Sequence, residues 1–166
     1  MIIAAQQDGQ GIGRIRLACI PDASAESLQS FIQANIKPGS IVRTDGWTGY
    51  AALAQLGYAH QAHRLSGQGR DAATKLLPRI HRVASLLKRW LLGTHQGAVR
   101  PAHLDYYLDE FTFRFNRRKS RSRGKLFYRL LQQAVEVTPT AWAQLRGGRV
   151  LPEPNPKVLG AVESTK

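Results

Sequence analysis

The sequence predicts an α/β fold from the order of three features in its first 45 residues. Apolar residues alternate on both sides of the tight-turn dipeptide Asp8-Gly9, a pattern that indicates two antiparallel strands. Apolar residues with helical spacing follow over residues 25–36, and a short β-branched run, Ile41 and Val42, then stops at Asp45. Two strands, a helix and a further strand in this order are typical of an α/β protein.

The hairpin is predicted over residues 1–20. Its first strand is M-I-I-A-A-Q-Q, its turn is D-G-Q-G, and its second strand is I-G-R-I-R-L-A-C-I. In the second strand the alternating apolar residues are Ile12, Ile15, Leu17 and Cys19. Cys19 is the single cysteine of the chain, so we expect a buried structural thiol, with a reactive thiol as the alternative.

The first helix has two candidate caps, Asp22 and Ser24, and ends before Lys37-Pro38-Gly39. Its apolar residues are Ala25, Leu28, Phe31, Ile32 and Ile36. After Asp45, residues 48–56 predict a short helix and residues 58–65 a strand. Residues 66–74, S-G-Q-G-R-D-A-A-T, have the glycines and small polar residues of a mobile loop.

An amphipathic helix is predicted over residues 76–92, L-L-P-R-I-H-R-V-A-S-L-L-K-R-W-L-L. Its buried stripe is expected to consist of Leu76, Ile80, Val83, Leu87 and Leu91. A polar file beside the stripe contains His81, Ser85, Lys88 and Leu92. This spacing places the imidazole of His81 and the ammonium of Lys88 two turns apart on one side of the helix.

The second half of the chain predicts two more helices and a tail. Pro101 suits the first turn of a helix whose buried residues are expected to be Leu104, Tyr107, Leu108, Phe111 and Phe115. A basic run follows, with six Lys and Arg among the nine residues 117–125. The last helix, over 125–135, carries an apolar face of Leu126, Leu130, Leu131 and Val135. We predict a folded core over residues 1–135 and a flexible tail over 136–166.

The charge of the chain favours a nucleic-acid partner. Lys and Arg number 24 against 11 Asp and Glu, a formal net charge of +13, with an isoelectric point near 10.7. An excess of this size favours a polyanion, with an anionic membrane as the alternative. The sequence lacks the roughly 18 uninterrupted apolar residues of a membrane span and the layout of a signal peptide. We therefore predict a cytoplasmic protein without a membrane partner.

Four blocks of the sequence together resemble one family. They are T-D-G-W-T-G-Y, L-A-Q-L-G-Y, S-L-L-K-R-W-L-L-G-T and Y-L-D-E-F-T-F-R-F-N-R-R. In this order they resemble the bacterial insertion-sequence transposases of the DDE superfamily, and the resemblance covers residues 1–135. The chain is similar to the group whose third catalytic position is Glu, Asn or His, with a Lys seven residues later, as His81 and Lys88 are spaced.

The resemblance implies a ribonuclease-H-like (integrase-type) mixed sheet flanked by helices. Such a fold holds divalent metal, Mg²⁺ or Mn²⁺, between three side chains, and it cuts and joins the DNA of transposon ends and target. The first acidic ligand of the family lies on a central strand that precedes the segment matching residues 1–7. We therefore expect an amino-terminally truncated transposase that lacks this strand, with weak metal binding, impaired catalysis and an open strand edge that favours a homodimer.

The resemblance assigns roles to three residues. Asp45 matches the second acidic position and His81 the third, so both become metal ligands, with 35 residues between them. Lys88 is expected to contact DNA phosphate or to orient the attacking group. Without the family, Asp45 is an Asp-Gly turn, His81 a surface residue and Lys88 a solvated lysine. A nitrogen ligand such as His81 suits manganese or zinc better than magnesium.

Other residues are predicted to bind nucleic acid. Trp47 and Tyr50 suit stacking on a displaced base, with packing of a helix on the sheet as the alternative. The cations expected to contact phosphate are Arg82, Lys88, Arg89, Arg117, Arg118, Lys119, Arg121, Arg123 and Lys125.

Three interpretations remain open at this point. The first is a transposase fragment that binds DNA with little or no catalysis. The second is a working nuclease completed by a second chain or by an upstream product. The third is a basic nucleic-acid-binding protein without catalysis, in which the basic run over 117–125 is the functional part.

Overall fold

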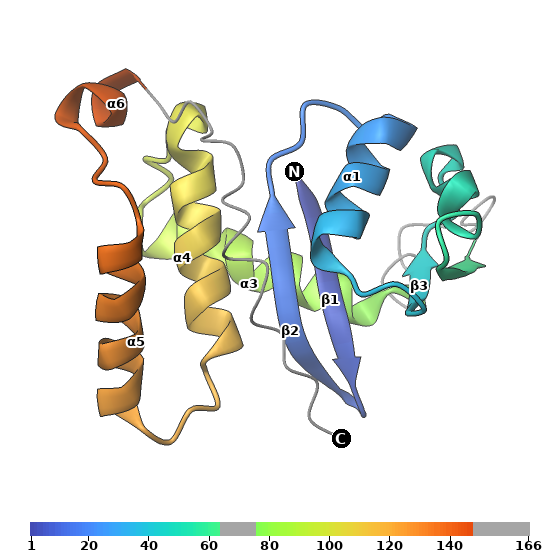
Figure 1. Cartoon of the computed structure of the whole chain (residues 1–166), viewed down its shortest axis with the longest axis horizontal. Coiled ribbons are helices and arrows are strands. Elements are labelled where there is room, and N and C mark those ends of the chain that lie inside the picture. Colours follow the sequence, from blue (N-terminus) through green and yellow to red (C-terminus); the bar gives the residue numbers. More distant parts are fainter. Residues whose placement is uncertain (64–75, 148–166) are drawn as a thin grey trace.

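The protein is an α/β structure in which two small sheets are surrounded by helices (Figure 1). This computed structural model describes residues 1–63 and 76–147. The strands in these ranges form two separate pairs, one antiparallel and one parallel. The α/β class predicted from the order of elements is therefore confirmed.

The predicted amino-terminal hairpin is present. Strand β1 (Ile2–Asp8) pairs antiparallel with β2 (Gly11–Ala18), and the turn between them passes through Gly9, whose φ of 54° suits glycine. The register shifts within the hairpin so that two residues of β2 oppose one residue of β1, which is a β-bulge. The bulge explains why Ile12 and Ile15, three positions apart, both pack on the same hydrophobic core.

Helix α1 (Ala25–Asn35) begins where the sequence places its caps. Ser24 is the N-cap, and its Oγ accepts a hydrogen bond from the backbone N–H of Ser27 at 3.3 Å. Asp22 Oδ1 in turn accepts hydrogen bonds from the N–H of Ser24 and the hydroxyl of Ser27. The buried residues of the helix are Leu28, Phe31 and Ile32.

The second sheet consists of β3 (Ile41–Thr44) and β4 (Ala59–Ala62), which run parallel. The predicted helix over residues 48–56 is a shorter 3₁₀ helix, η1 (Thr48–Leu53). It ends early because the chain turns at Gly57, whose φ is 82°, to bring β4 beside β3.

The predicted boundaries between residues 58 and 92 change in three places. The strand predicted over 58–65 spans only Ala59–Ala62, and residues 64 and 65 lie outside the described residues. The predicted loop over 66–74 lies wholly outside them. Helix α3 (Pro78–Gly93) begins two residues later than predicted, because Pro78 disfavours helical backbone at Leu77, whose φ and ψ are −124° and 56°.

Helix α3 packs its apolar stripe against the hairpin. Val83 and Leu87 are buried there, as the periodicity predicts. The amino-terminal end of the helix is tied to the hairpin turn by Arg79, which donates hydrogen bonds to the carbonyl oxygens of Gly11 at 2.9 Å and Gly9 at 2.8 Å. The start and the middle of α3 therefore both contact the hairpin.

Helix α4 (Leu104–Asn116) runs along the outer edge of β2 and follows a short 3₁₀ turn, η2 (Pro101–His103). Asn116 Oδ1 accepts a hydrogen bond from the N–H of Ile15 at 2.7 Å, and its Nδ2 donates to the carbonyl of Ile15 at 3.0 Å. At the other end, Asp105 Oδ1 accepts from the N–H of Cys19 at 3.2 Å. Side chains of α4 thus provide hydrogen bonds to a strand edge that has no neighbouring strand in the described residues.

The two faces of the hairpin are covered by two hydrophobic clusters. The first joins β2 to α3 and α4 through Ile15, Leu17, Val83, Leu87, Leu108, Phe111 and Phe115. The second joins α1 to the second sheet through Phe31, Ile32, Leu53 and Tyr58, with Ile2, Ala4 and Ala18 of the hairpin packed against it. Leu104 and Tyr107, which the sequence places in the core, are half-buried at its margin.

Cys19 lies at the end of β2 and is half-buried. Burial first, and then the hydrogen bond and negative charge of Asp105, raise the pKa of its thiol. A raised pKa keeps the thiol protonated and unreactive, which favours the structural interpretation.

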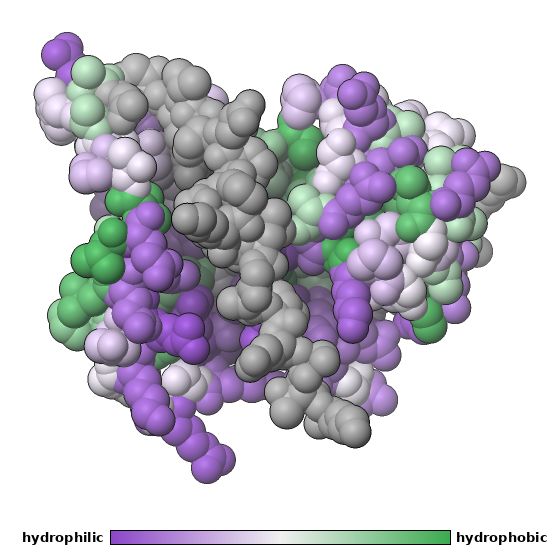
Figure 2. Space-filling view, viewed as in Figure 1, coloured by the Kyte–Doolittle hydropathy of each residue, from purple (hydrophilic) through white to green (hydrophobic). Residues whose placement is uncertain are grey.

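Helix α5 (Arg123–Glu136) has the predicted apolar face, but that face is largely exposed. Leu130 is 50% exposed and Val135 is 85% exposed. Figure 2 shows hydrophobic surface over α5 at the left of the molecule. In the described part of the predicted tail, up to residue 147, lies a short helix, α6 (Trp142–Gly147). In the part of the chain that the structure describes, no helix has the length and apolar character needed to cross a membrane.

The contact between α4 and the edge of β2 gives a prediction. In Asn116→Ala the N–H of Ile15 loses its partner in a partly buried setting, and its carbonyl keeps only the hydrogen bond from Arg16, so we expect unfolding to become easier by about 1–3 kcal/mol. Urea denaturation followed by circular dichroism measures this. Gln33→Ala, at an exposed position of α1, is the control and should change stability by less than about 0.5 kcal/mol. Equal effects of the two substitutions would contradict the role assigned to Asn116.

Candidate functional site

Asp45 lies at the carboxyl end of β3, as predicted, and its side chain is exposed. Its Oδ1 accepts a hydrogen bond from the N–H of Trp47 at 3.2 Å, which closes a turn through Gly46 with φ of 79°. The carboxylate therefore has both a local structural role and access to solvent.

Two histidines bond to Thr44, the last residue of β3, and sequence reasoning singled out neither. His60 on β4 has its Nε2 at 2.8 Å from Thr44 Oγ1, and its ring centroid is 6.3 Å from that of Tyr50. His63 directly follows β4, and its N–H donates to the carbonyl of Thr44 at 2.9 Å. The parallel pairing of β3 with β4 brings both histidines to Thr44, which precedes Asp45 in the chain, and no local sequence signal marks that pairing.

The pKa of Tyr50 depends on its burial and on the nearby charge of Asp45. Burial is the main cause that raises the pKa of its hydroxyl, and the negative charge of Asp45 raises it further. Tyr50 also packs against the core formed by α1 and η1. The structure thus supports the packing alternative for Tyr50.

His81 and Lys88 lie on α3, where the sequence places them. His81 is half-buried in the first turns, and Lys88 is exposed two turns further on. The structure describes no hydrogen bond or ion pair that joins Asp45, His81 and Lys88. Across residues 1–63 and 76–147, no group of three or more His, Cys, Asp or Glu side chains is placed to hold a metal ion.

The described residues do not supply the two-metal site that the resemblance implies. Mg²⁺ binds oxygen ligands and is usually held by carboxylates, whereas among the described residues Asp45 does not belong to a group of three or more His, Cys, Asp or Glu side chains that could hold a metal ion. The described residues therefore supply too few oxygen donors for a pair of hard divalent ions.

The predicted cations on α3 are exposed. Arg82, Lys88 and Arg89 all lie on its solvent side. The ion pairs among the described residues, Arg114–Glu110 at 2.7 Å and Lys119–Asp8 at 3.3 Å, involve none of the three. These α3 cations thus remain available to an anionic partner.

The first two cations of the basic run hold the end of α4 in place. The guanidinium of Arg117 lies 3.8 Å from the ring centroid of Phe113, and that of Arg118 lies 3.8 Å from Phe115. Arg118 also donates hydrogen bonds to backbone carbonyls of the hairpin, at Ile12 and Gly13. Structural contacts therefore explain part of a run that the sequence predicts to bind nucleic acid.

The remaining residues of the run differ in setting. Lys119 pairs with Asp8 of the hairpin at 3.3 Å. Arg121 and Lys125 are exposed. The side chain of Arg123 lies outside the described part of the chain.

Trp47 has a fixed orientation and a large exposed surface. Its Nε1 donates a hydrogen bond to the carbonyl of Ala23 at 3.0 Å, and 54% of the residue is exposed. Gly49 passes beneath it, where an added Cβ would lie 2.8 Å from Leu28 and 3.1 Å from the indole. A rigid, half-exposed indole is compatible with both stacking on a base and packing.

Comparison with known proteins gives one match. The family model described as the ISXO2-like transposase domain matches residues 1–116, which is the region from the hairpin to the end of α4. No curated protein and no solved structure matches the chain. The matched region contains T-D-G-W-T-G-Y, His81 and Lys88, the residues on which the resemblance in the sequence depends. The chain therefore belongs to the ISXO2-like transposase domain family, a family of insertion-sequence transposases of the DDE type.

Proposed function

We propose that this chain is a DNA-binding transposase domain whose strand-cleavage activity is impaired. The family match over residues 1–116 is the observation that carries the proposal. The net charge of +13 and the exposed cations of α3 support binding to transposon ends and target DNA. Chromosomal DNA as the substrate favours a cytoplasmic location in a bacterium.

We further propose that the fold is a ribonuclease-H-like domain, with residues 1–135 as its core. The order of an antiparallel hairpin, a helix, two parallel strands and a long helix supports this assignment.

The proposed impairment follows from the donors around Asp45. Cutting a phosphodiester requires an activated water or hydroxyl and neutralisation of the leaving oxygen. Because Asp45 belongs to no group of three or more potential metal ligands in the described residues, we expect weak binding of Mg²⁺ or Mn²⁺. We still propose Asp45, His81 and Lys88 as the residues that correspond to the catalytic positions of the family.

A plasmid assay tests both parts of the proposal. Purified protein is incubated with supercoiled plasmid and Mg²⁺ or Mn²⁺, and binding and nicking are followed on the same gel. We expect retarded plasmid that stays supercoiled. Metal-dependent nicking that disappears in both Asp45→Ala and His81→Ala would show that the constellation is a working site, and the impairment would then be wrong.

A second candidate function is a basic nucleic-acid-binding protein without transposition. The exposure of Arg121 and Lys125, beyond the family match, favours it. For this function, Arg121→Glu with Lys125→Glu should abolish binding, whereas Arg82→Glu with Arg89→Glu on α3 should leave it nearly unchanged. For the transposase domain the α3 pair should have the larger effect. Gel retardation of the same duplex separates the two.

We also propose a homodimer joined at the open strand edges. Strands β1 and β3 each have one paired neighbour in the described residues, so each leaves backbone groups unpaired on its other side. Ile41 on β3 is 61% exposed, and an apolar, exposed edge favours pairing with another chain.

Sedimentation velocity tests the dimer. We expect a dimer for the unmodified chain and a shift towards monomer for Ile41→Lys, because a charged edge residue opposes strand pairing. Leu92→Lys is the matched control, since Leu92 is exposed on α3, away from both strand edges. A monomer at all concentrations, or an equal effect of the two substitutions, would contradict this arrangement.

A further inference from the structure

A group of arginines gathers where β2 meets the end of α4. Arg14 and Arg16 flank Ile15 on β2, and both point away from the side on which Ile15 is buried. Asn116 holds the N–H and carbonyl of Ile15, so the next residue, Arg117, is fixed beside the same stretch of strand. Two elements about 100 residues apart in sequence therefore bring the backbone of Arg117 beside the strand segment that carries Arg14 and Arg16.

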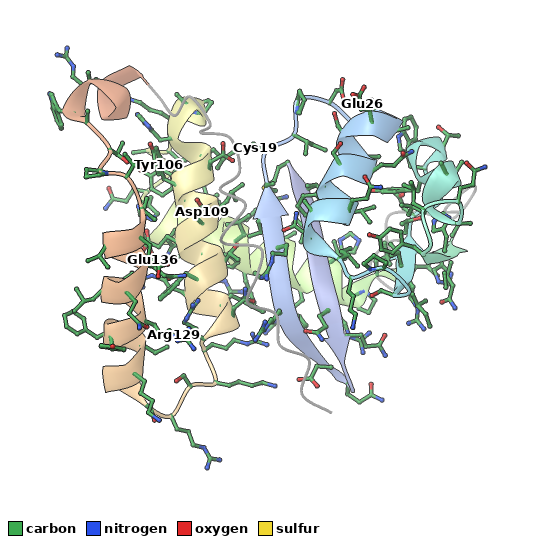
Figure 3. All side chains as sticks on the ribbon, viewed as in Figure 1. Cys19, Glu26, Tyr106, Asp109, Arg129 and Glu136 are labelled. Atoms are coloured by element: carbon green, nitrogen blue, oxygen red, sulfur yellow. The ribbon has the colours of Figure 1, made fainter. Side chains whose placement is uncertain are left out.

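A fourth arginine approaches from α5. Arg129 lies on α5 near the carboxyl end of α4 (Figure 3), and its charge acts on Arg117. Burial first, and then the positive charges of Arg129, Arg14 and Arg16, lower the pKa of Arg117. The pKa of Arg16 is lowered by burial and then by Arg14. Arg117 is thus repelled by each of the other three arginines, and Arg16 is repelled by Arg14.

Acidic residues do not balance this charge in the described structure. Its ion pairs are Arg114–Glu110 and Lys119–Asp8, and neither includes a member of the group. Like charges held together without counter-charges destabilise a fold unless something else is gained. An anion bound between them would remove that repulsion.

The surface at this place is hollowed. A groove of about 300 Å³ lies between the hairpin and the end of α4, and its basic lining residues are Arg14, Arg118 and Lys119. Asp8 is the acidic lining residue, and Lys119 already pairs with it. Hydrophilic side chains gather between the lower ends of α4 and β2 (Figure 2). The groove therefore offers an anion a polar, positively charged setting.

We propose that Arg14, Arg16, Arg117 and Arg129 form a phosphate-binding site for the DNA backbone. Guanidinium groups bind phosphate oxygens through paired, charge-assisted hydrogen bonds, which makes arginine suited to this role. The site rests on the proposed DNA binding and adds a second contact surface, distinct from the cations of α3. Arg14 and Arg16 stand apart in the sequence from the basic run, which is why composition does not reveal them.

The test compares two double variants that each remove two positive charges. Arg14→Gln with Arg16→Gln removes half of the group, and Lys37→Gln with Arg100→Gln, at exposed positions elsewhere, is the matched control. Fluorescence anisotropy with a short labelled duplex gives the dissociation constant at several salt concentrations. We expect roughly tenfold weaker binding for the first variant, and a salt slope lower by about two, because each phosphate contact contributes roughly 0.9 to the slope. The control should bind like the unmodified chain.

Thermal unfolding provides a readout that a purely structural role would not give. Removing two mutually repelling charges should leave the melting temperature of Arg14→Gln with Arg16→Gln equal to or above that of the unmodified chain. Inorganic pyrophosphate should raise the melting temperature of the unmodified chain and of the control, and should raise that of the Arg14, Arg16 variant less.

The outcomes separate the two proposals. If the unmodified chain binds no DNA, the proposed function fails, and this site fails with it. If the unmodified chain binds DNA but the Arg14, Arg16 variant matches the control, the phosphate site alone is overturned. A loss of stability in that variant, with an unchanged salt slope, would assign these arginines to the fold and overturn the site as well.

Discussion

The structure depends on the way α4 closes the outer edge of β2. A hairpin of two strands is barely stable alone in water, and its exposed edge invites pairing with other chains. Here Asn116 and Asp105 supply the hydrogen bonds that a further strand would give, at Ile15 and Cys19. The same contact aligns Leu108 and Phe111 with the core and fixes the carboxyl end of α4, from which the basic run begins. The contact between α4 and β2 therefore positions the hydrophobic core, the outer edge of β2 and the start of the basic run.

Much of the fold could be predicted from local signals. The Asp-Gly turn, the Ser24 cap and the apolar spacing of α3 and α4 each determine structure within a few residues, and each is present as predicted. The late start of α3 also has a local cause, Pro78. The prediction followed the apolar periodicity from Leu76 and did not take this proline into account. The exposed face of α5 had no such signal, because an amphipathic pattern records which residues share a face and not whether another element covers it.

The candidate site was predicted less well than the fold, because its geometry is set by contacts between distant residues. The position of Asp45 at a strand end followed from the sequence, but the contacts of His60 and His63 with Thr44 depend on which strand pairs with β3. The basic run was the obvious nucleic-acid interface in the sequence, yet its cations Arg117 and Arg118 stack on aromatic rings of α4. The sequence shows how many charges a segment carries, whereas only the fold shows which charges from distant segments lie close together.

The division of the strands into two sheets has a consequence for how the protein unfolds. Between the hairpin and the β3–β4 pair, the structure describes a side-chain hydrogen bond from Arg43 to Gln7 at 3.1 Å and no shared ladder of backbone hydrogen bonds. One hydrophobic cluster lies on each face of the hairpin, and the hairpin separates the two clusters. Cooperative unfolding depends on interactions that are lost together. We therefore expect the α1–η1–β4 side and the α3–α4 side to unfold in separate steps, so that the calorimetric enthalpy of unfolding exceeds the van't Hoff enthalpy.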